Sequence, residues 1–130
     1  MIVLDTSVLV AILRAEPDAD TFLTRIVAAD RCLISSVTLL ETSMVLAGRN
    51  PFPGIWNGLD QLIETAGVTI IPFSPAHACL AREAFIRFGK GRHPAALNFG
   101  DCASYALARE RNLPLLFKGN NFSQTDLATT

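Results

Sequence analysis

The sequence predicts an α/β domain in which a mostly parallel central sheet is flanked by helices. Short apolar runs alternate along the chain with segments whose apolar residues recur at helical spacing. Strands that are separated by helices are typical of parallel sheets with helices on both faces. The 130 residues, half of them hydrophobic, suffice for one domain with a real core. No repeat, low-complexity tract or linker divides the chain, so a single domain over residues 1–130 is expected.

Four short apolar runs are the strand candidates, and each is bounded by residues that cap or break regular structure. They cover residues 2–4, 32–34, 68–71 and 114–117. In a parallel α/β sheet, sites form beyond the carboxyl ends of the strands. Polar residues directly after these runs are therefore the first candidates for a functional site.

Helices are expected between the strands, because the intervening segments carry capping residues and apolar residues three and four positions apart. These helices run from Thr6 or Ser7 through Leu13, around 22–27, from Ser35 or Ser36 to near Gly48, over 55–66, from Pro75 through Phe88 and over 100–110. Segments 49–54 and 89–98 are rich in Gly and Pro and are expected to be loops.

Composition excludes several classes of protein. The net charge of −1 argues against a protein that holds nucleic acid by bulk positive charge. No apolar run reaches the roughly 18 residues of a membrane helix, and no signal peptide is recognisable, so a cytosolic location is expected. Three widely spaced cysteines, expected to be buried, predict neither a zinc site nor a disulfide framework. The mean hydropathy of +0.35 is high, which suggests that a partner covers some apolar surface.

Asp5 directly follows the first strand candidate and precedes a helix, whose N-terminus favours negative charge. It therefore lies at the edge of the sheet where sites form. An unpaired buried carboxylate is costly, so its place in an apolar run requires a partner.

Glu41 lies in a helix whose apolar stripe is Val37, Leu40, Met44 and Val45, and its position matches that stripe. The stripe is expected to face the core, which would turn Glu41 inward. Asp101 opens another helix; there a cap or a partner for the helix dipole is at least as good an explanation.

Three inward carboxylates have two physical outcomes: structural ion pairs, or a shared divalent cation. The faces around Asp5, Glu41 and Asp101 offer no obvious Lys or Arg, which favours the cation. Ligands that are all oxygen select Mg²⁺ or Mn²⁺. Such ions suit phosphodiester hydrolysis by metal-activated water, a reaction that requires no nucleophilic side chain.

Four segments together resemble the PIN domain ribonucleases, specifically the VapC-type toxins of bacterial toxin–antitoxin pairs. They are MIVLDTSVLVAIL at the start, SSVTLLE (35–41), NFGDCASYALA (98–108) and LPLLFKGNNFSQTDL (113–127). The resemblance implies a three-layer PIN-like fold and Mg²⁺- or Mn²⁺-dependent endonucleolytic cleavage of RNA. It also implies a small antitoxin partner that covers the site and, together with the apolar composition, a homodimer.

The resemblance assigns the metal-binding and catalytic roles to Asp5, Glu41 and Asp101. At the family's fourth acidic position this chain has Asn121, which can offer a carbonyl oxygen but no charge, whereas Asp126 is retained. One metal, with a second recruited alongside substrate phosphate, is therefore expected.

For some polar residues around the acids, an ordinary structural role explains the residue as well as a functional role does. Thr6 and Ser7 look like hydroxyl ligands, and helix capping explains them as well. Lys118 could hold substrate phosphate, or be a solvated lysine in a turn.

Residues outside the four segments carry weaker expectations. The basic loop residues Lys90, Arg92 and His93 could meet the RNA backbone, although simple exposure is the more common outcome. Phe52 and Trp56 could dock a protein partner or pack in the core. His77 is expected on a helix surface without a partner.

Two other functions are open from the sequence. One is a PIN-like binding module whose catalysis has been weakened by the change at Asn121. The other is a phospho-acceptor receiver domain, which would need paired acids after the first strand and an acceptor aspartate after a central strand. Asp5 stands alone and VTIIPF contains no acid, so the nuclease is preferred.

Overall fold

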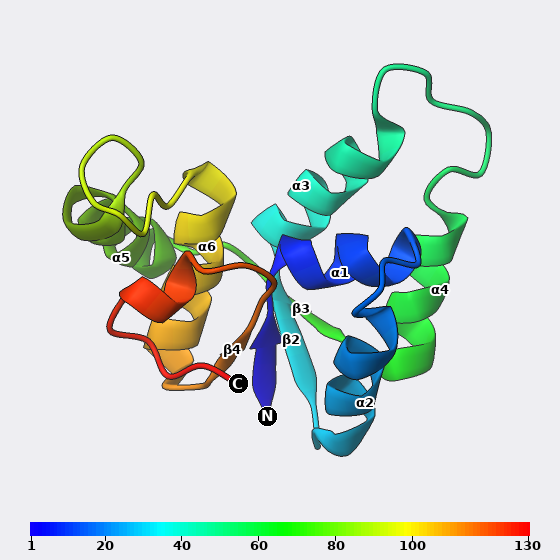
Figure 1. Cartoon of the computed structure of the whole chain (residues 1–130), viewed down its shortest axis with the longest axis horizontal. Coiled ribbons are helices and arrows are strands. Elements are labelled where there is room, and N and C mark those ends of the chain that lie inside the picture. Colours follow the sequence, from blue (N-terminus) through cyan, green and yellow to red (C-terminus); the bar gives the residue numbers. More distant parts are fainter.

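The computed structural model describes all residues 1–130, and its centre is a four-stranded parallel sheet (Figure 1). The strands are β1 (Ile2–Leu4), β2 (Cys32–Ser35), β3 (Thr69–Ile71) and β4 (Leu115–Leu116), in the order β3-β2-β1-β4. The predicted α/β class with a parallel sheet is thus confirmed. Because β1 is central, Asp5 after it lies in the middle of the carboxyl-terminal edge.

Helices cover both faces of the sheet, as expected (Figure 1). They are α1 (Thr6–Leu13), α2 (Ala19–Ala28), α3 (Ser36–Ala47), α4 (Asn57–Ala66), α5 (Pro75–Phe88) and α6 (Phe99–Arg111), followed by a short 3₁₀ helix, η1 (Phe122–Gln124). No helix is long and apolar enough to cross a membrane.

The hydrophobic core has two halves, one on each face of the sheet. Ile2 and Leu4 pack with α1, α2 and α4, whereas Val3 and Leu33 pack with α5 and α6. This division follows from the period of two along a strand, which sends neighbouring side chains to opposite faces. Both halves hold the carboxyl end of β1 in place.

The expectation for α3 was wrong in its orientation. The buried residues of this helix are Thr38 and Thr42, whereas Leu40 is 59% exposed and Met44 is 65% exposed. The reason is the position of α3, which lies beyond the carboxyl end of the sheet and packs against α1 and α6 rather than on a sheet face (Figure 1). Small threonines make that close contact, and the apolar stripe is left on the surface.

Two smaller expectations also fail. His77 is buried, and its Nε2 is paired with the Glu110 carboxylate, so α5 and α6 are joined at that point. Helical spacing alone could not reveal a partner from another helix. Cys32 and Cys102 are buried as expected, but Cys79 is exposed; all three are free thiols.

Candidate active site

A surface hollow at the carboxyl-terminal edge of the sheet brings together Asp5, Glu41 and Asp101. These side chains come from the end of β1, from α3 and from the first turn of α6. Thr6, Ser7, Glu16, Asn98 and Lys118 line the same hollow. The fold therefore gathers the three acids that the sequence singled out.

Asp5 is 3% exposed, and hydrogen bonds hold both of its carboxylate oxygens. As the N-cap of α1 it accepts bonds at Oδ2 from the backbone N–H of Ser7 (3.1 Å) and from the Ser7 hydroxyl (2.7 Å). Its Oδ1 accepts a bond from the Ser104 hydroxyl on α6, at 2.7 Å. These donors offset the cost of burying the carboxylate without neutralising its charge.

Glu41 reaches the hollow because residue 100 has no side chain. A Cβ built on Gly100 would lie 2.0 Å from Glu41 Oε2 and 2.2 Å from the carboxylate carbon. The Glu41 carboxylate thus rests against the backbone of α6, one residue before Asp101. Its half-buried state comes from this contact and not from the core-facing stripe that the sequence suggested.

Asp101 combines a capping role with a site role. Its Oδ2 accepts from the Asn98 backbone N–H at 3.0 Å, while Asn98 Oδ1 accepts from the Asp101 N–H at 2.9 Å, which forms a capping box. Burial, together with the nearby charges of Asp5 and Glu41, raises the pKa of Asp101 to about 6. The hydrogen bond from the Asn98 backbone acts in the opposite direction. Asp101 therefore caps α6 and is also one of the three acids of the hollow.

The negative charges of Asp5, Glu41 and Asp101 are not balanced by ion pairs with the protein. Every ion pair of the structure involves other acids: Glu16, Asp18, Glu110 and Asp126. The structural ion-pair explanation for Asp5, Glu41 and Asp101 is therefore excluded. An oxygen-only donor set with uncompensated charge fits a hard divalent cation.

The three acids do not, however, form a closed cage. No three Asp, Glu, His or Cys side chains are arranged so that they could together hold one metal ion. Direct ligation by all three acids, as the sequence suggested, does not match this arrangement. A hard cation of the Mg²⁺ type is usually held by one or two carboxylates and keeps several waters, and the hollow fits that mode.

Lys118 lies at the rim of the hollow, as predicted, but it has partners there. Its Nζ is 3.0 Å from Glu16 Oε1 and 3.2 Å from Asp18 Oδ1, and hydrogen bonds to these carboxylates raise its pKa. Its backbone N–H donates to Ser7 Oγ at 2.9 Å. Ser7 thus supports Asp5, whereas the buried Thr6 Oγ1 has no hydrogen-bond partner. The capping role considered for Thr6 and Ser7 is wrong, because Asp5 itself is the N-cap of α1.

The two C-terminal candidates, Asn121 and Asp126, lie in different surroundings. The Asn121 side chain is close enough to Asp101 to oppose the rise in the pKa of that group. Asp126 lies outside the hollow: Tyr105 donates to it at 2.7 Å, and Arg87 and Arg109 are paired with it. Two arginines thus compensate the charge of Asp126 away from the three acids, and its supporting role stays a prediction.

The basic loop does not line the hollow. Arg92 lies over the Phe85 ring, 5.4 Å from its centroid, and His93 packs edge-on against Phe88. Lys90 is exposed. The loop is anchored to α5 by its own side chains, and nothing places its charges beside the three acids.

Sequence reasoning missed Ser104, Gly100, Glu16 and Asn98. Ser104 had a usable signal, because it follows Asp101 by three residues in a helix and so lies on the same face. Gly100 had none that stands out, because it is the first residue of the helix predicted over 100–110 and glycine is tolerated at a helix start. Glu16 had none, because it follows the first helix and reaches the hollow only through the local fold.

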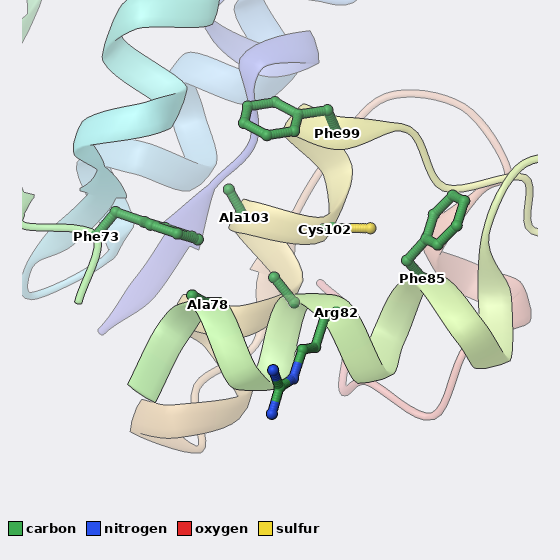
Figure 2. A pocket seen from close by; sticks show the side chains of 8 residues that line it. Phe73, Ala78, Arg82, Phe85, Phe99, Cys102 and Ala103 are labelled. Carbon is green, nitrogen blue, oxygen red and sulfur yellow. The ribbon is translucent and has the colours of Figure 1, made fainter. Parts of the chain in front are cut away.

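An apolar groove lies next to the hollow, between α5 and α6. Its aromatic walls are Phe73, Phe85 and Phe99, with Cys102 and Ala103 of α6 between them (Figure 2). Phe99 is 81% exposed and also borders the apolar stripe of α3, which continues to Glu41 and Val45. The acids are thus flanked by an unusually apolar surface for a free protein.

Comparison with known proteins identifies the family. The PIN domain model matches residues 2–127. Ribonuclease VapC30 of Mycobacterium tuberculosis is 45% identical over 127 residues, which cover 98% of this chain and 96% of that protein. Ribonuclease VapC of Mycolicibacterium smegmatis is 47% identical over 127 residues, with 97% of both chains covered.

Solved structures show the same fold at lower identity. VapC20 of Mycobacterium tuberculosis, described as a toxin that cleaves the sarcin-ricin loop, has a TM-score of 0.78 at 20% identity, and the match covers 100% of this chain and 98% of that one. VapBC2 of Rickettsia felis, bound to a DNA fragment of its promoter, has a TM-score of 0.77 at 20% identity, with the same coverage. A receiver domain is thereby excluded, and the chain belongs to the PIN domain family, with VapC ribonucleases as its relatives.

Proposed function

We propose that this chain, as one PIN domain over residues 1–130, is a Mg²⁺- or Mn²⁺-dependent endoribonuclease that acts as the toxin of a toxin–antitoxin pair. The observation that carries the proposal is the hollow in which Asp5, Glu41 and Asp101 meet, none of them paired with a cation of the protein. The ribonuclease activity named for relatives that are 45% and 47% identical gives this acidic site its chemistry.

The residues divide the work according to their surroundings. Asp5 and Asp101, which are buried and held by hydrogen bonds, would hold the metal ion together with water. When bound, the ion polarises the phosphate and lowers the pKa of its water. Glu41, which reaches the hollow from α3, would orient water there.

Substrate phosphate would meet the rim of the hollow. Lys118 is the basic residue there, and its pairing with Glu16 and Asp18 keeps its ammonium group at the edge. Asn121 near Asp101 offers a neutral oxygen, so a second metal would depend on oxygens of the substrate. Lys90, Arg92 and His93 are left with at most a peripheral contact to RNA.

The proposed partners are a small antitoxin protein and a second copy of the chain. Several solved structures with this fold are toxin–antitoxin complexes, including one from Klebsiella pneumoniae. The exposed stripe of α3 and the groove of Figure 2 are apolar surfaces that such partners would cover. Phe52 and Trp56 are also exposed, which removes the core explanation for them. A cytoplasmic location follows from this role.

The test is RNA cleavage by the purified chain with Mg²⁺, with Mn²⁺ and with EDTA. The parent should cleave only with metal, and Asp5→Asn and Glu41→Gln should remove cleavage while circular dichroism stays unchanged. Cleavage that persists in EDTA, or in the Asp5→Asn variant, contradicts the proposal. A folded parent that binds metal but cleaves no RNA would instead favour the binding module, for which the asparagine at position 121 is the argument.

A further inference from the structure

Each oxygen of the Asp5 carboxylate is the end of a separate hydrogen-bonded chain. One chain runs from the Lys118 backbone N–H to Ser7 Oγ (2.9 Å) and from Ser7 to Asp5 Oδ2 (2.7 Å). The other involves Thr38 Oγ1, Ser104 Oγ and Asp5 Oδ1. Asp5 is therefore held from α1, α3, α6 and the segment after β4.

The second chain is not explained by local structure. Ser104 lies in the interior of α6 and is fully buried, as is Thr38 on α3. The single hydroxyl proton of Ser104 goes to Asp5 at 2.7 Å, so its oxygen is left to accept from Thr38, 3.4 Å away. Neither hydroxyl caps a helix or faces solvent, and their side-chain partners are each other and Asp5.

Counting acceptor sites shows what this arrangement does to Asp5. An ionised carboxylate has about four lone-pair sites, two on each oxygen. Oδ2 accepts two bonds from Ser7, whereas Oδ1 accepts one from Ser104. The remaining acceptor site is therefore on Oδ1, and the direction of the Ser104 bond decides where it points.

We infer that Ser104 is a positioning residue that fixes Asp5 so that Oδ1 presents one free lone pair to the hollow, with Thr38 orienting Ser104. The inference rests on the proposed function for the identity of the ligand, a hard divalent cation. Asp5 would then have Oδ1 left to offer to that cation. Partners that orient a metal ligand typically change metal affinity about 10–100-fold when they are removed.

The first measurement is Mn²⁺ affinity by isothermal titration calorimetry on the full chain. Ser104→Ala should weaken binding about 10–100-fold. Thr38→Val, which keeps the shape of the side chain, should weaken binding less, and Thr38→Ser should restore the parent value. Ser43→Ala is the matched control, since that hydroxyl donates to the Leu39 carbonyl on α3, outside the hollow. A folded Ser104→Ala variant that binds Mn²⁺ within twofold of the parent overturns the inference.

The second measurement is a double-mutant cycle in urea unfolding, which requires neither metal nor RNA. Ser104→Ala should lower the unfolding midpoint of the parent clearly more than that of Asp5→Ala, because the acceptor is missing in the second background. Equal shifts in both backgrounds show that the contact carries no energy and overturn the inference.

The two proposals fail in different ways. If the parent cleaves RNA and Ser104→Ala matches it in Mn²⁺ affinity, only the positioning role falls. If Mn²⁺ binding and the coupling to Asp5 are found but the parent cleaves no RNA, only the nuclease falls. A parent that binds no Mn²⁺ overturns both the metal-dependent reaction and the metal-positioning role.

Discussion

Helix α6 touches two aspartates whose environments are opposite. Asp101, in its first turn, is buried beside two other carboxylates, and its pKa is raised to about 6, chiefly by burial. Asp126 accepts a hydrogen bond from Tyr105, which lies one turn after Asp101 in α6, and it is paired with Arg87 and Arg109. Burial tends to raise the pKa of Asp126 as well, but Tyr105, Arg87 and Arg109 bring it below its ordinary value.

The contrast distinguishes Asp126, a carboxylate that stabilises the fold, from Asp101, a carboxylate that destabilises it. Asp126 fastens the C-terminal segment to α5 and α6, and its charge is compensated where it lies. The charge of Asp101 is compensated by nothing in the protein, so it is retained at a cost in stability. A charged side chain that lowers the stability of the fold in this way is a candidate functional group.

The largest expected effect is on catalysis, and it distinguishes the two environments directly. Asp101→Asn should reduce metal-dependent RNA cleavage on the order of 1,000-fold, because a charge in the metal-binding hollow is lost. Asp126→Asn should cleave within a few-fold of the parent. Equal losses in the two variants, measured in one cleavage assay, would mean that the hollow is not the active site.

The next effect concerns the approach of Glu41 to α6. Gly100→Ala would place a methyl group 2.0 Å from Glu41 Oε2, so the flexible carboxylate must move away. Because a displacement of about 1 Å can cost roughly 100-fold in rate, we expect a loss of that order with little change in stability. Gly58→Ala is the matched control: this other helical glycine has only Leu13 within reach, at 3.5 Å. Full activity in Gly100→Ala would show that Glu41 need not lie there.

The third prediction concerns stability of the metal-free protein and its dependence on pH. The folded-state pKa of Asp101 lies above its ordinary value of 3.8, so the folded state binds the proton more tightly and loses stability as the pH rises from about 4 to about 6. Asp101→Asn should therefore be more stable than the parent at pH 7 by up to about 3 kcal/mol. The difference should vanish below about pH 4 in urea unfolding with EDTA. A lower midpoint at pH 7 would contradict the conclusion that burial and the neighbouring charges make ionised Asp101 destabilising.

The smallest effect has the opposite sign. The pKa of Asp126 is lowered in the fold, so its stabilising contribution is present above its ordinary pKa and is lost as the pH falls through the folded value. Asp126→Asn should lower stability at pH 7 by about 1 kcal/mol or less, because the arginine partners are half-exposed and screened. The same urea series measures it, and a stabilised variant would contradict the pairing.

The sequence predicted the sheet and the helix order well, because each depends on local signals. Asp5 after a buried run and Asp101 after Asn98 carry their own evidence for position. The orientation of α3 was not predictable in the same way. An apolar stripe shows which face is distinctive, but only the tertiary position of the helix decides whether that face meets the core or the surface.

The partners of two polar residues could not be predicted, for one physical reason. Asp126 and His77 find their partners on neighbouring helices, through contacts with Arg87 and Glu110 that no spacing rule reveals. The spacing of Ser104 places it on the same face of α6 as Asp101, but its acceptor, Asp5, lies 99 positions earlier in the chain. Long-range contacts therefore hold Asp126 outside the hollow and bring Ser104 to Asp5.

That separation has a consequence for synthesis of the protein. The carboxylate after the first strand has its donors on α6 and, through Ser7, at the start of the segment after β4. A nascent chain therefore lacks the complete acidic hollow until residues up to Lys118 have left the ribosome. Growing chains shorter than this would carry no assembled centre, so the hollow forms only after the fourth strand has been synthesised.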